Sequence, residues 1–143
     1  VTSMDVIEHL DDDAALAEYH RVLRPGGLVL LTVPAYQWLW SEHDDWAAHR
    51  RRYTRRRLVA AVERAGFRPL RSTYFNSFLL PPAAVLRRTP ARRLVTVQQD
   101  ELGAASPAVD RVMTGLAAVE RRWARGRRTV PFGLSIVTLA GRD

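Results

Sequence analysis

The chain has 143 residues, of which 47% are hydrophobic and 26% charged, a composition typical of one folded domain and not of a disordered chain. It contains no cysteine, which excludes disulfides and thiolate metal sites. Its net charge of +7 comes from 22 basic residues, all arginine, and such an excess attracts phosphates, nucleic acid or anionic lipid. The longest apolar runs, 28–33 and 78–86, are too short to cross a bilayer, and we expect a cytoplasmic protein.

The first elements in chain order are a helix and a buried strand. Residues 11–23 place apolar side chains three and four apart, with acids in the first turn, and this pattern predicts a helix. Pro25 and the Gly26-Gly27 pair end it. The run LVLLTV over 28–33 is continuously apolar, which is typical of a strand buried on both faces of a parallel sheet.

A second helix and strand follow a polar, aromatic loop over 34–53. Thr54 is a good N-cap for a helix over 55–65, and Gly66 is its C-terminal stop. Residues 70–75 alternate in character and predict another strand.

The pattern changes after residue 76. A Pro-rich, basic stretch and a loop over 98–108 precede an amphipathic helix over 108–125, so we expect an insertion or lid at about 77–130. Strand character returns at 134–140. This alternation of strands and helices predicts an α/β fold, with helices packed on a mostly parallel sheet.

Five motifs occur in order along the chain. They are DVIEHL at 5–10, E-x-x-R-V-L-R-P-G-G at 18–27, HxRRY at 49–53, AGF at 65–67 and PFGLS at 131–135. With them the chain resembles the C-terminal half of class I S-adenosylmethionine-dependent methyltransferases. The HxRRY and PFGLS motifs are similar to those of a bacterial subgroup.

The resemblance implies a Rossmann-like sheet of seven strands. The present strands would be the end of the fourth, followed by the fifth, sixth and seventh, with the last antiparallel between its neighbours. Residues 1–143 would then be the C-terminal part of a single methyltransferase domain. The other half of such enzymes holds the glycine-rich turn that cradles the cofactor, and no such turn occurs here. We therefore expect a fragment that is inactive by itself.

The implied activity is methyl transfer from S-adenosylmethionine to a small-molecule or lipid-linked acceptor, with oxygen as the preferred atom. Ser3, Met4 and Asp5 would contact the cofactor, mainly through backbone and shape, although Asp5 could equally be a structural turn residue. His9 is the candidate catalytic base, because an acceptor hydroxyl must lose a proton. The alternative is that Glu8 and His9 cap and orient the following helix.

The loop over 34–53 is the natural acceptor-binding segment by this resemblance. Tyr36, Trp40 and His49 are its candidate substrate contacts, and packing of the loop as a lid over the core is the alternative.

Two further features of this loop concern its charged groups. His43-x-Asp45-x-x-x-His49 can be drawn as a metal site, but its spacing fits no established zinc motif, and we expect no metal. One of the acids Asp44 and Asp45 is expected to pair with one of the arginines Arg51 and Arg52 and to hold the loop closed.

The basic segments define the rival function, a non-catalytic binding module for an anionic polymer or a membrane surface. The arginine-rich run over 50–57 suggests a nucleic-acid patch, but its last three arginines fall in the first, solvated turn of a helix, so nucleic acid is not favoured as a partner. Residues 78–93 could lie on a membrane as a basic amphipathic helix, whereas a packed lid helix is the preferred interpretation.

Overall fold

The computed structural model describes residues 1–88, 107–125 and 128–143. Its sheet has four strands: β1 (Thr2–Met4), β2 (Leu28–Pro34), β3 (Phe67–Phe75) and β4 (Ser135–Arg142). The helices are α1 (Asp12–Val22), α2 (Glu42–Trp46), α3 (Arg55–Arg64), α4 (Leu80–Arg88) and α6 (Pro107–Arg125), and there are two short 3-10 turns, η1 (Gln37–Leu39) and η2 (Ser77–Leu79).

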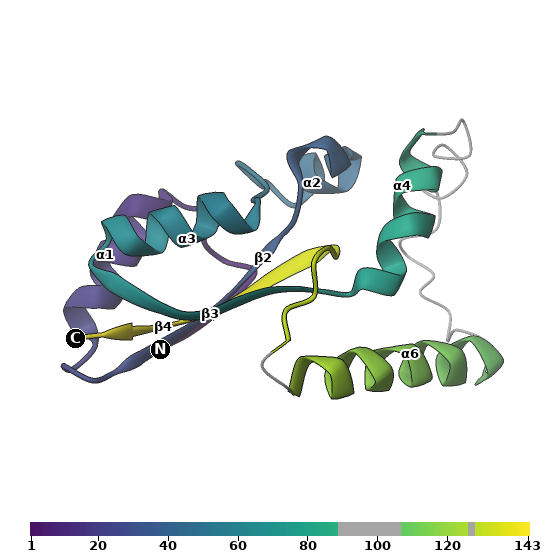
Figure 1. Ribbon diagram of the computed structural model, residues 1–143. Coiled ribbons are helices and arrows are strands. Elements are labelled where there is room, and N and C mark those ends of the chain that lie inside the picture. Colours follow the sequence, from purple (N-terminus) through teal and green to yellow (C-terminus); the bar gives the residue numbers. More distant parts are fainter. Residues whose placement is uncertain (89–106, 126–127) are drawn as a thin grey trace.

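The strands lie in the order β1-β2-β4-β3 (Figure 1). β1 is parallel to β2, and β4 runs antiparallel between β2 and β3. This confirms the α/β class and the expected antiparallel last strand. β3 begins at Phe67, earlier than predicted, because a register shift between Pro69 and Arg71 accommodates a proline that has no N–H to donate.

Helix α3 begins after the N-cap Thr54, as predicted, and α1 begins one residue later than predicted, after the N-cap Asp11. The Asp11 carboxylate accepts a hydrogen bond from the Ala14 N–H at 3.0 Å, and the Thr54 hydroxyl accepts one from the Arg57 N–H at 3.3 Å. Both helices lie on the same face of the sheet (Figure 1). An Ncap side chain satisfies one of the N–H groups that a helix start leaves without a partner, which fixes these boundaries.

The core lies between this face and the two helices. Fully buried apolar side chains from β2 and β4 meet fully buried side chains from α1 and α3; they are Val29, Leu31, Val33, Ile136, Ala140, Leu16, Leu58 and Val62. The other face of β2 is less covered, since Leu30 is only partly buried and Leu28 is 48% exposed. The prediction of a strand buried on both faces is therefore wrong for the first half of β2.

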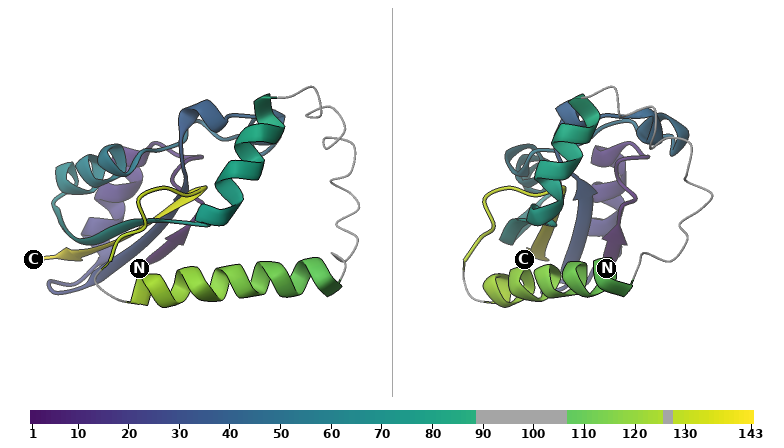
Figure 2. Two further views of the ribbon diagram at one scale, coloured as in Figure 1. Left: turned by 45° about the vertical axis from the view of Figure 1, so that its right-hand side comes forward. Right: turned by 90° about the vertical axis from the view of Figure 1, so that its right-hand side faces the viewer.

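Helices α4 and α6, which follow β3 in the chain, lie toward the end of the sheet where β3 ends (Figures 1 and 2). Contacts with β3 and the turn after it hold α6 in place. The Glu120 carboxylate accepts hydrogen bonds from the N–H groups of Asn76 and Ser77 at 2.8 and 2.9 Å, and Arg71 donates to the carbonyls of Ala124 and Arg128. The helix predicted over 108–125 is thus confirmed.

Some predictions fall outside the described residues. They are the loop at 98–106 and the end of the basic segment, 89–93, and the limits of an insertion at 77–130 stay a prediction. None of the helices in the described ranges combines the length and the hydropathy needed to cross a bilayer.

Candidate functional site

The candidate site lies at the edge of the sheet where β1 and β2 end. Because these strands are parallel, the turn after Met4 and the loop after Pro34 leave the sheet at the same edge. The backbone N–H of Arg50 donates to the Glu8 carbonyl at 2.8 Å and joins the loop to the turn. Ligands usually bind at this edge of an open α/β sheet.

The turn after β1 is fixed by its backbone. Asp5 has a φ of 51°, in the left-handed region that residues other than glycine adopt rarely. Its N–H donates to both the carbonyl and the hydroxyl of Thr32, at 3.0 and 3.1 Å. Asp5 thus has the structural turn role that the sequence allowed, and its side chain is exposed beside the site.

Glu8 is the most unusual residue of the site. Its side chain is fully buried, and neither carboxylate oxygen has a hydrogen-bond partner. Burial, reinforced by the nearby charge of Asp5, raises the pKa of Glu8 to about 7, although the residue's own backbone amide and the charge of Arg52 oppose the shift. The helix that follows is capped by Asp11, so the idea that the Glu8 and His9 side chains cap it is wrong.

Two histidines lie beside this carboxylate. The rings of His9 and His49 meet edge to face, with their centroids 4.6 Å apart. One ligand atom from each of Glu8, His9 and His49 lies within 4.8 Å of those of the other two. The fold thus brings His49 to the adjacent pair Glu8 and His9, so that a carboxylate and two imidazoles from two distant segments meet.

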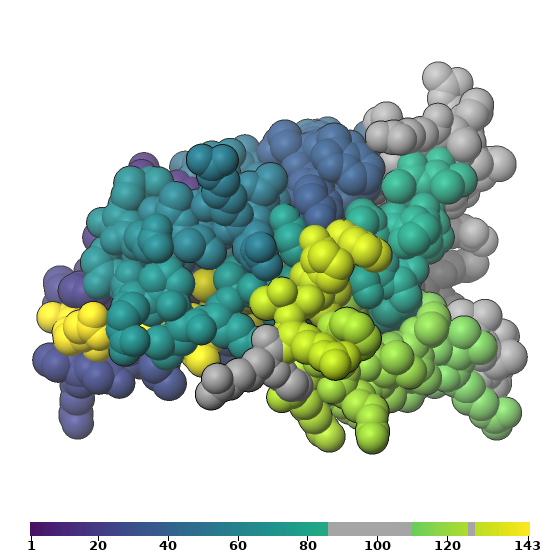
Figure 3. All heavy atoms as spheres, in the orientation of Figure 1, coloured from purple at the N-terminus to yellow at the C-terminus, as the bar shows by residue number. Residues whose placement is uncertain are grey.

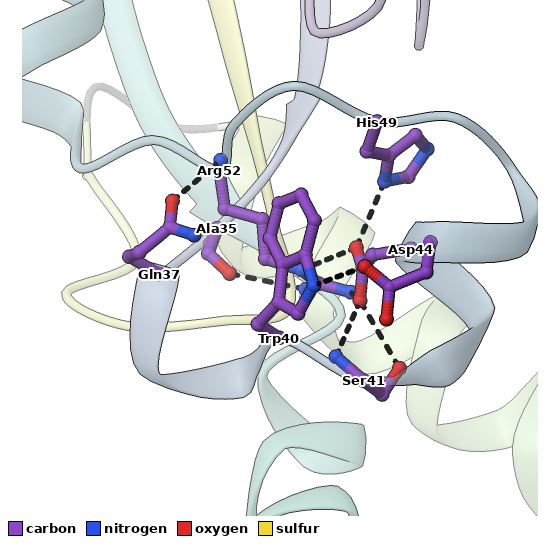
Figure 4. A network of polar contacts seen from close by, with 8 residues as sticks. Ala35, Gln37, Trp40, Ser41, Asp44, His49 and Arg52 are labelled. Carbon is purple, nitrogen blue, oxygen red and sulfur yellow. Dashed lines mark hydrogen bonds and ion pairs between the residues drawn. The ribbon is translucent and has the colours of Figure 1, made fainter.

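His49 is oriented by Asp44, as Figure 4 shows. Its Nδ1 lies 2.8 Å from Oδ1 of Asp44. The same buried carboxylate accepts two hydrogen bonds from Arg52, at 2.7 and 3.0 Å, and two from the N–H and hydroxyl of Ser41, at 2.8 and 3.0 Å. Burial alone would raise the pKa of Asp44, but the hydrogen bonds from Arg52 and His49 outweigh it and lower the pKa to about 2.

The predicted pairing of an acid with an arginine of this loop is confirmed by Asp44 and Arg52. Arg52 also donates to the Ala35 carbonyl at 3.2 Å, so this buried guanidinium ties the loop to the end of β2. Arg51 instead pairs with Asp12 at the start of α1. Two arginines of the 50–57 run are therefore already neutralised by carboxylates, which weakens the case for a nucleic-acid patch.

Of the candidate substrate contacts, the structure brings two into one network. The Trp40 indole N–H donates to Asp45 at 2.9 Å, next to the Asp44 carboxylate that holds His49 (Figure 4). Tyr36 lies in a separate aromatic stack on Tyr74, with centroids 5.2 Å apart. Burial and a hydrogen bond with Tyr74 raise the pKa of Tyr36 to about 12, so this phenol stays protonated at neutral pH.

The candidate cofactor contacts differ in exposure. Ser3 is buried, and its hydroxyl lies 3.1 Å from the Tyr19 hydroxyl, on the side of α1. The side chain of Met4 is 60% exposed and that of Val6 is 38% exposed. Met4 and Asp5 are thus open to a ligand at the end of β1, whereas the side chain of Ser3 is already engaged.

A hollow of about 310 Å³ lies beside α6. Figure 3 shows the segment just before β4 packed over this helix. The lining is almost wholly apolar and comprises Ser77, Phe78, Leu116, Val119, Glu120, Trp123, Val130, Pro131 and Phe132. This groove offers an apolar surface on the helical segment that follows β3.

Sequence reasoning missed the isolation of the Glu8 carboxylate and the buried contact of Asp12 with Tyr53. The Tyr53 hydroxyl donates to Asp12 at 2.9 Å. Burial opposes the shift, but the hydrogen bonds from Arg51 and Tyr53 lower the pKa of Asp12. A signal for Glu8 was present, because this acid follows Val6 and Ile7 and precedes Leu10 in an apolar context.

Comparison with known proteins supports the same fold. Residues 1–31 match the family model described as a methyltransferase domain. No curated protein matches the chain. The solved structures to which the chain is similar include the phosphoethanolamine N-methyltransferase 2 of Haemonchus contortus in complex with S-adenosylmethionine (TM-score 0.53, 16% identity), the cyclase SpnF (0.51, 22%), and a geranyl diphosphate methyltransferase in complex with S-adenosylmethionine (0.55, 12%).

These alignments cover 99 to 100% of this chain, but only 33%, 49% and 50% of the three structures, respectively. The expected resemblance to class I methyltransferases is confirmed at the level of the fold. The chain has the part of the Rossmann-like methyltransferase sheet in which an antiparallel strand lies between two parallel ones.

Proposed function

We propose that these residues belong to an S-adenosylmethionine-dependent methyltransferase that acts on an acceptor hydroxyl. The observation that carries the proposal is the position of the Glu8, His9 and His49 cluster beside the open end of β1. The similar structures include both a methyltransferase and a cyclase, so the acceptor is inferred from the residues of this chain. A cytoplasmic location stays a prediction.

The residues at the end of β1 fit one wall of a cofactor site. Met4 and Val6 present exposed apolar surface, and the left-handed turn at Asp5 leaves a carboxylate at the same edge. When bound, S-adenosylmethionine supplies an electrophilic methyl group on a sulfonium. In this proposal Met4 contacts the cofactor by shape, Ser3 supports the strand end from the side of α1, and Asp5 fixes the backbone that the cofactor meets.

The cluster supplies the proton chemistry. Methyl transfer is an in-line displacement, so the protein mainly aligns the reacting atoms and excludes water. A hydroxyl acceptor must also lose its proton, and we assign His9 as the group that takes it. His49, oriented by Asp44, would contact the acceptor together with Trp40, while Tyr36 would border it from the aromatic stack.

The acceptor is proposed to be a small or lipid-linked molecule with an apolar part. The groove beside α6 supports this proposal, because Phe78, Leu116 and Trp123 line it with apolar surface. Arg128 lies over the Trp123 ring, 4.9 Å from its centroid, and places a positive charge near the groove that would suit an anionic linker.

The test is a turnover assay on the protein from the longest reading frame that contains these residues. S-adenosylhomocysteine release would be measured with a panel of hydroxyl acceptors, some carrying a lipid. We expect His9→Asn to lower kcat about 100-fold or more while leaving the Kd for S-adenosylmethionine within about threefold. His20→Gln is the control, because His20 packs against Phe67 outside the site and its replacement should leave turnover unchanged.

Absence of release with every acceptor, or full turnover by His9→Asn, would contradict the proposal. Transfer to an amine but not to a hydroxyl would overturn the assignment of oxygen. Release only with lipid-bearing acceptors would place the apolar groove in the acceptor site.

A further inference from the structure

The Glu8 carboxylate lacks the partner that a buried carboxylate normally has. It is fully buried, and both of its oxygens lack a hydrogen-bond partner. Burying a charged group without a partner is costly, and such groups are normally paired with a cation or coordinate a metal. The positive charge of Arg52 acts on Glu8, but this guanidinium donates two hydrogen bonds to Asp44 and none to Glu8.

The two side chains beside this carboxylate are histidines, a residue type that often binds metal ions. His9 and His49 each bring an imidazole nitrogen, and the three potential ligand atoms lie within 4.8 Å of one another. In a tetrahedral site with ligand bonds of about 2.1 Å, neighbouring ligand atoms are about 3.4 Å apart. Small side-chain rotations in a site of this size would bring the three atoms to bonding distance of one ion.

The surroundings of His49 match those of a metal ligand. Its Nδ1 contacts the buried Asp44 carboxylate at 2.8 Å, which leaves Nε2 for an ion. A histidine ligand usually donates its other ring N–H to a carboxylate or carbonyl, which fixes the tautomer and makes the ligand more basic. Asp44 is itself held by hydrogen bonds from Ser41 and Arg52, which fixes the carboxylate that orients His49 (Figure 4).

We propose that Glu8, His9 and His49 bind one divalent first-row transition ion, with Zn²⁺ the preferred occupant. Two imidazoles and one carboxylate form a donor set found in catalytic zinc sites, whereas Mg²⁺ favours oxygen ligands. The expectation of no metal considered His43 and Asp45 with His49. The structure joins His49 to residues of a different segment, and Asp45 accepts from Trp40.

Three protein ligands leave coordination positions open. An acceptor oxygen could occupy one of them and lose its proton to solvent more readily; this step rests on the proposed function. In that form of the reaction the ion takes the place of His9 in activating the acceptor, because His9 uses its ring nitrogen as a ligand. Metal binding itself does not depend on the methyl donor.

The test is metal titration of the protein from the longest reading frame that contains these residues, after removal of metal with a chelator and without any methyl donor. Co²⁺ would be followed by its visible absorption and Zn²⁺ by calorimetry. We expect one equivalent of Zn²⁺ with a Kd of about 1 μM or tighter. His9→Ala, His49→Ala and Glu8→Gln should each weaken binding at least about tenfold, and Asp44→Asn about 10 to 100-fold.

His20→Gln is the matched control, since it removes a histidine outside the cluster and should bind as the unmodified chain does. Circular dichroism of each variant checks its folding. If a variant fails to fold, the Co²⁺ spectrum of the unmodified chain decides: intense visible bands of a four- or five-coordinate ion support the site, and their absence contradicts it. Unchanged affinity in folded His9→Ala and His49→Ala would also overturn the proposal. Since no donor is present, this failure is distinct from a failure of methyl transfer.

Discussion

The loop between β2 and α3 and the helix α6 both lie at the same end of the sheet, yet opposite kinds of contact hold them. The loop buries a charged network around Asp44 and Arg52, whose side chains are 0% and 7% exposed. Helix α6 has an exposed apolar stripe, in which Val112 is 61% and Val119 68% exposed. Hydrogen bonds near one end of this helix attach it to the region around β3.

The difference shows what each region can tolerate. A buried ion pair is sensitive to the loss of either partner, because the remaining charge is stranded away from water. An exposed apolar face loses little when it is changed, and it remains available for a ligand or another surface. The loop is therefore suited to holding polar groups in fixed positions, and α6 to presenting an apolar surface.

The largest expected effect is on the buried pair. Arg52→Ala leaves the Asp44 carboxylate buried with fewer partners, and we expect the free energy of unfolding to fall by about 3–5 kcal/mol. Urea unfolding followed by circular dichroism measures it. Arg21→Ala, which breaks a fully exposed pair with Glu18, should cause no measurable change. Equal effects for the two variants would show that the loop network is no more important than a surface pair.

A matched pair of glycine substitutions sharpens the contrast. A Cβ at Gly133 would lie 2.2 Å from the Phe75 carbonyl oxygen, whereas a Cβ at Gly115 in α6 meets nothing within 4 Å. Gly133→Ala should lower the free energy of unfolding by about 1–3 kcal/mol. Gly115→Ala should leave it unchanged or raise it by up to about 1 kcal/mol, because alanine favours the helix. Thermal unfolding of both variants is the measurement, and a reversed order would contradict the packing described here.

The pH dependence of stability tests the contact between the loop and α1. The pKa of Asp12 is lowered below 3.8, so its pairing stabilises the fold above pH 3.8 and this contribution is lost as the pH falls through the folded-state pKa. Asp12→Asn should reduce stability at neutral pH and flatten the loss between about pH 5 and pH 2. Unfolding curves across this range would measure both slopes, and parallel slopes would refute the role of Asp12.

The smallest expected effect is on the exposed stripe of α6. Val119→Ser removes an apolar side chain that is 68% exposed, and we expect the free energy of unfolding to change by less than about 0.5 kcal/mol. If Val119 lines the acceptor site, the same change should raise KM for a lipid-bearing acceptor. A large loss of stability would show that α6 packs more tightly than its exposure indicates.

The sequence predicted most of the helices and strands, but of the buried network only the pairing of an acid with an arginine. Continuous apolar runs, Pro25 and Thr54 predicted strands and helix boundaries, because these signals are local. The short helix α2 was missed, although Ser41-x-x-Asp44 forms a capping box, since the surrounding loop is polar and has no apolar periodicity.

The site was predicted less completely for a physical reason. His9 and His49 were both candidates, but their edge-to-face contact depends on where the loop returns to the sheet. The isolation of Glu8 depends equally on tertiary packing, because the sequence alone does not show which carboxylates are buried away from solvent. The pairing of one of the acids Asp44 and Asp45 with one of the arginines Arg51 and Arg52 was predicted, because opposite charges within one loop have few other partners. The sequence left open that the pair is Asp44 and Arg52.

The central claim is that the open end of β1 forms part of a methyl-donor site. It is tested most directly by calorimetric titration of S-adenosylmethionine into the protein from the longest reading frame that contains these residues. Met4 and Val112 are exposed apolar side chains of nearly equal exposure, 60% and 61%, so Met4→Arg and Val112→Arg are matched variants. The account predicts micromolar binding that Met4→Arg weakens at least about tenfold and Val112→Arg leaves unchanged. Absence of binding by the unmodified protein, or equal binding by both variants, would contradict it.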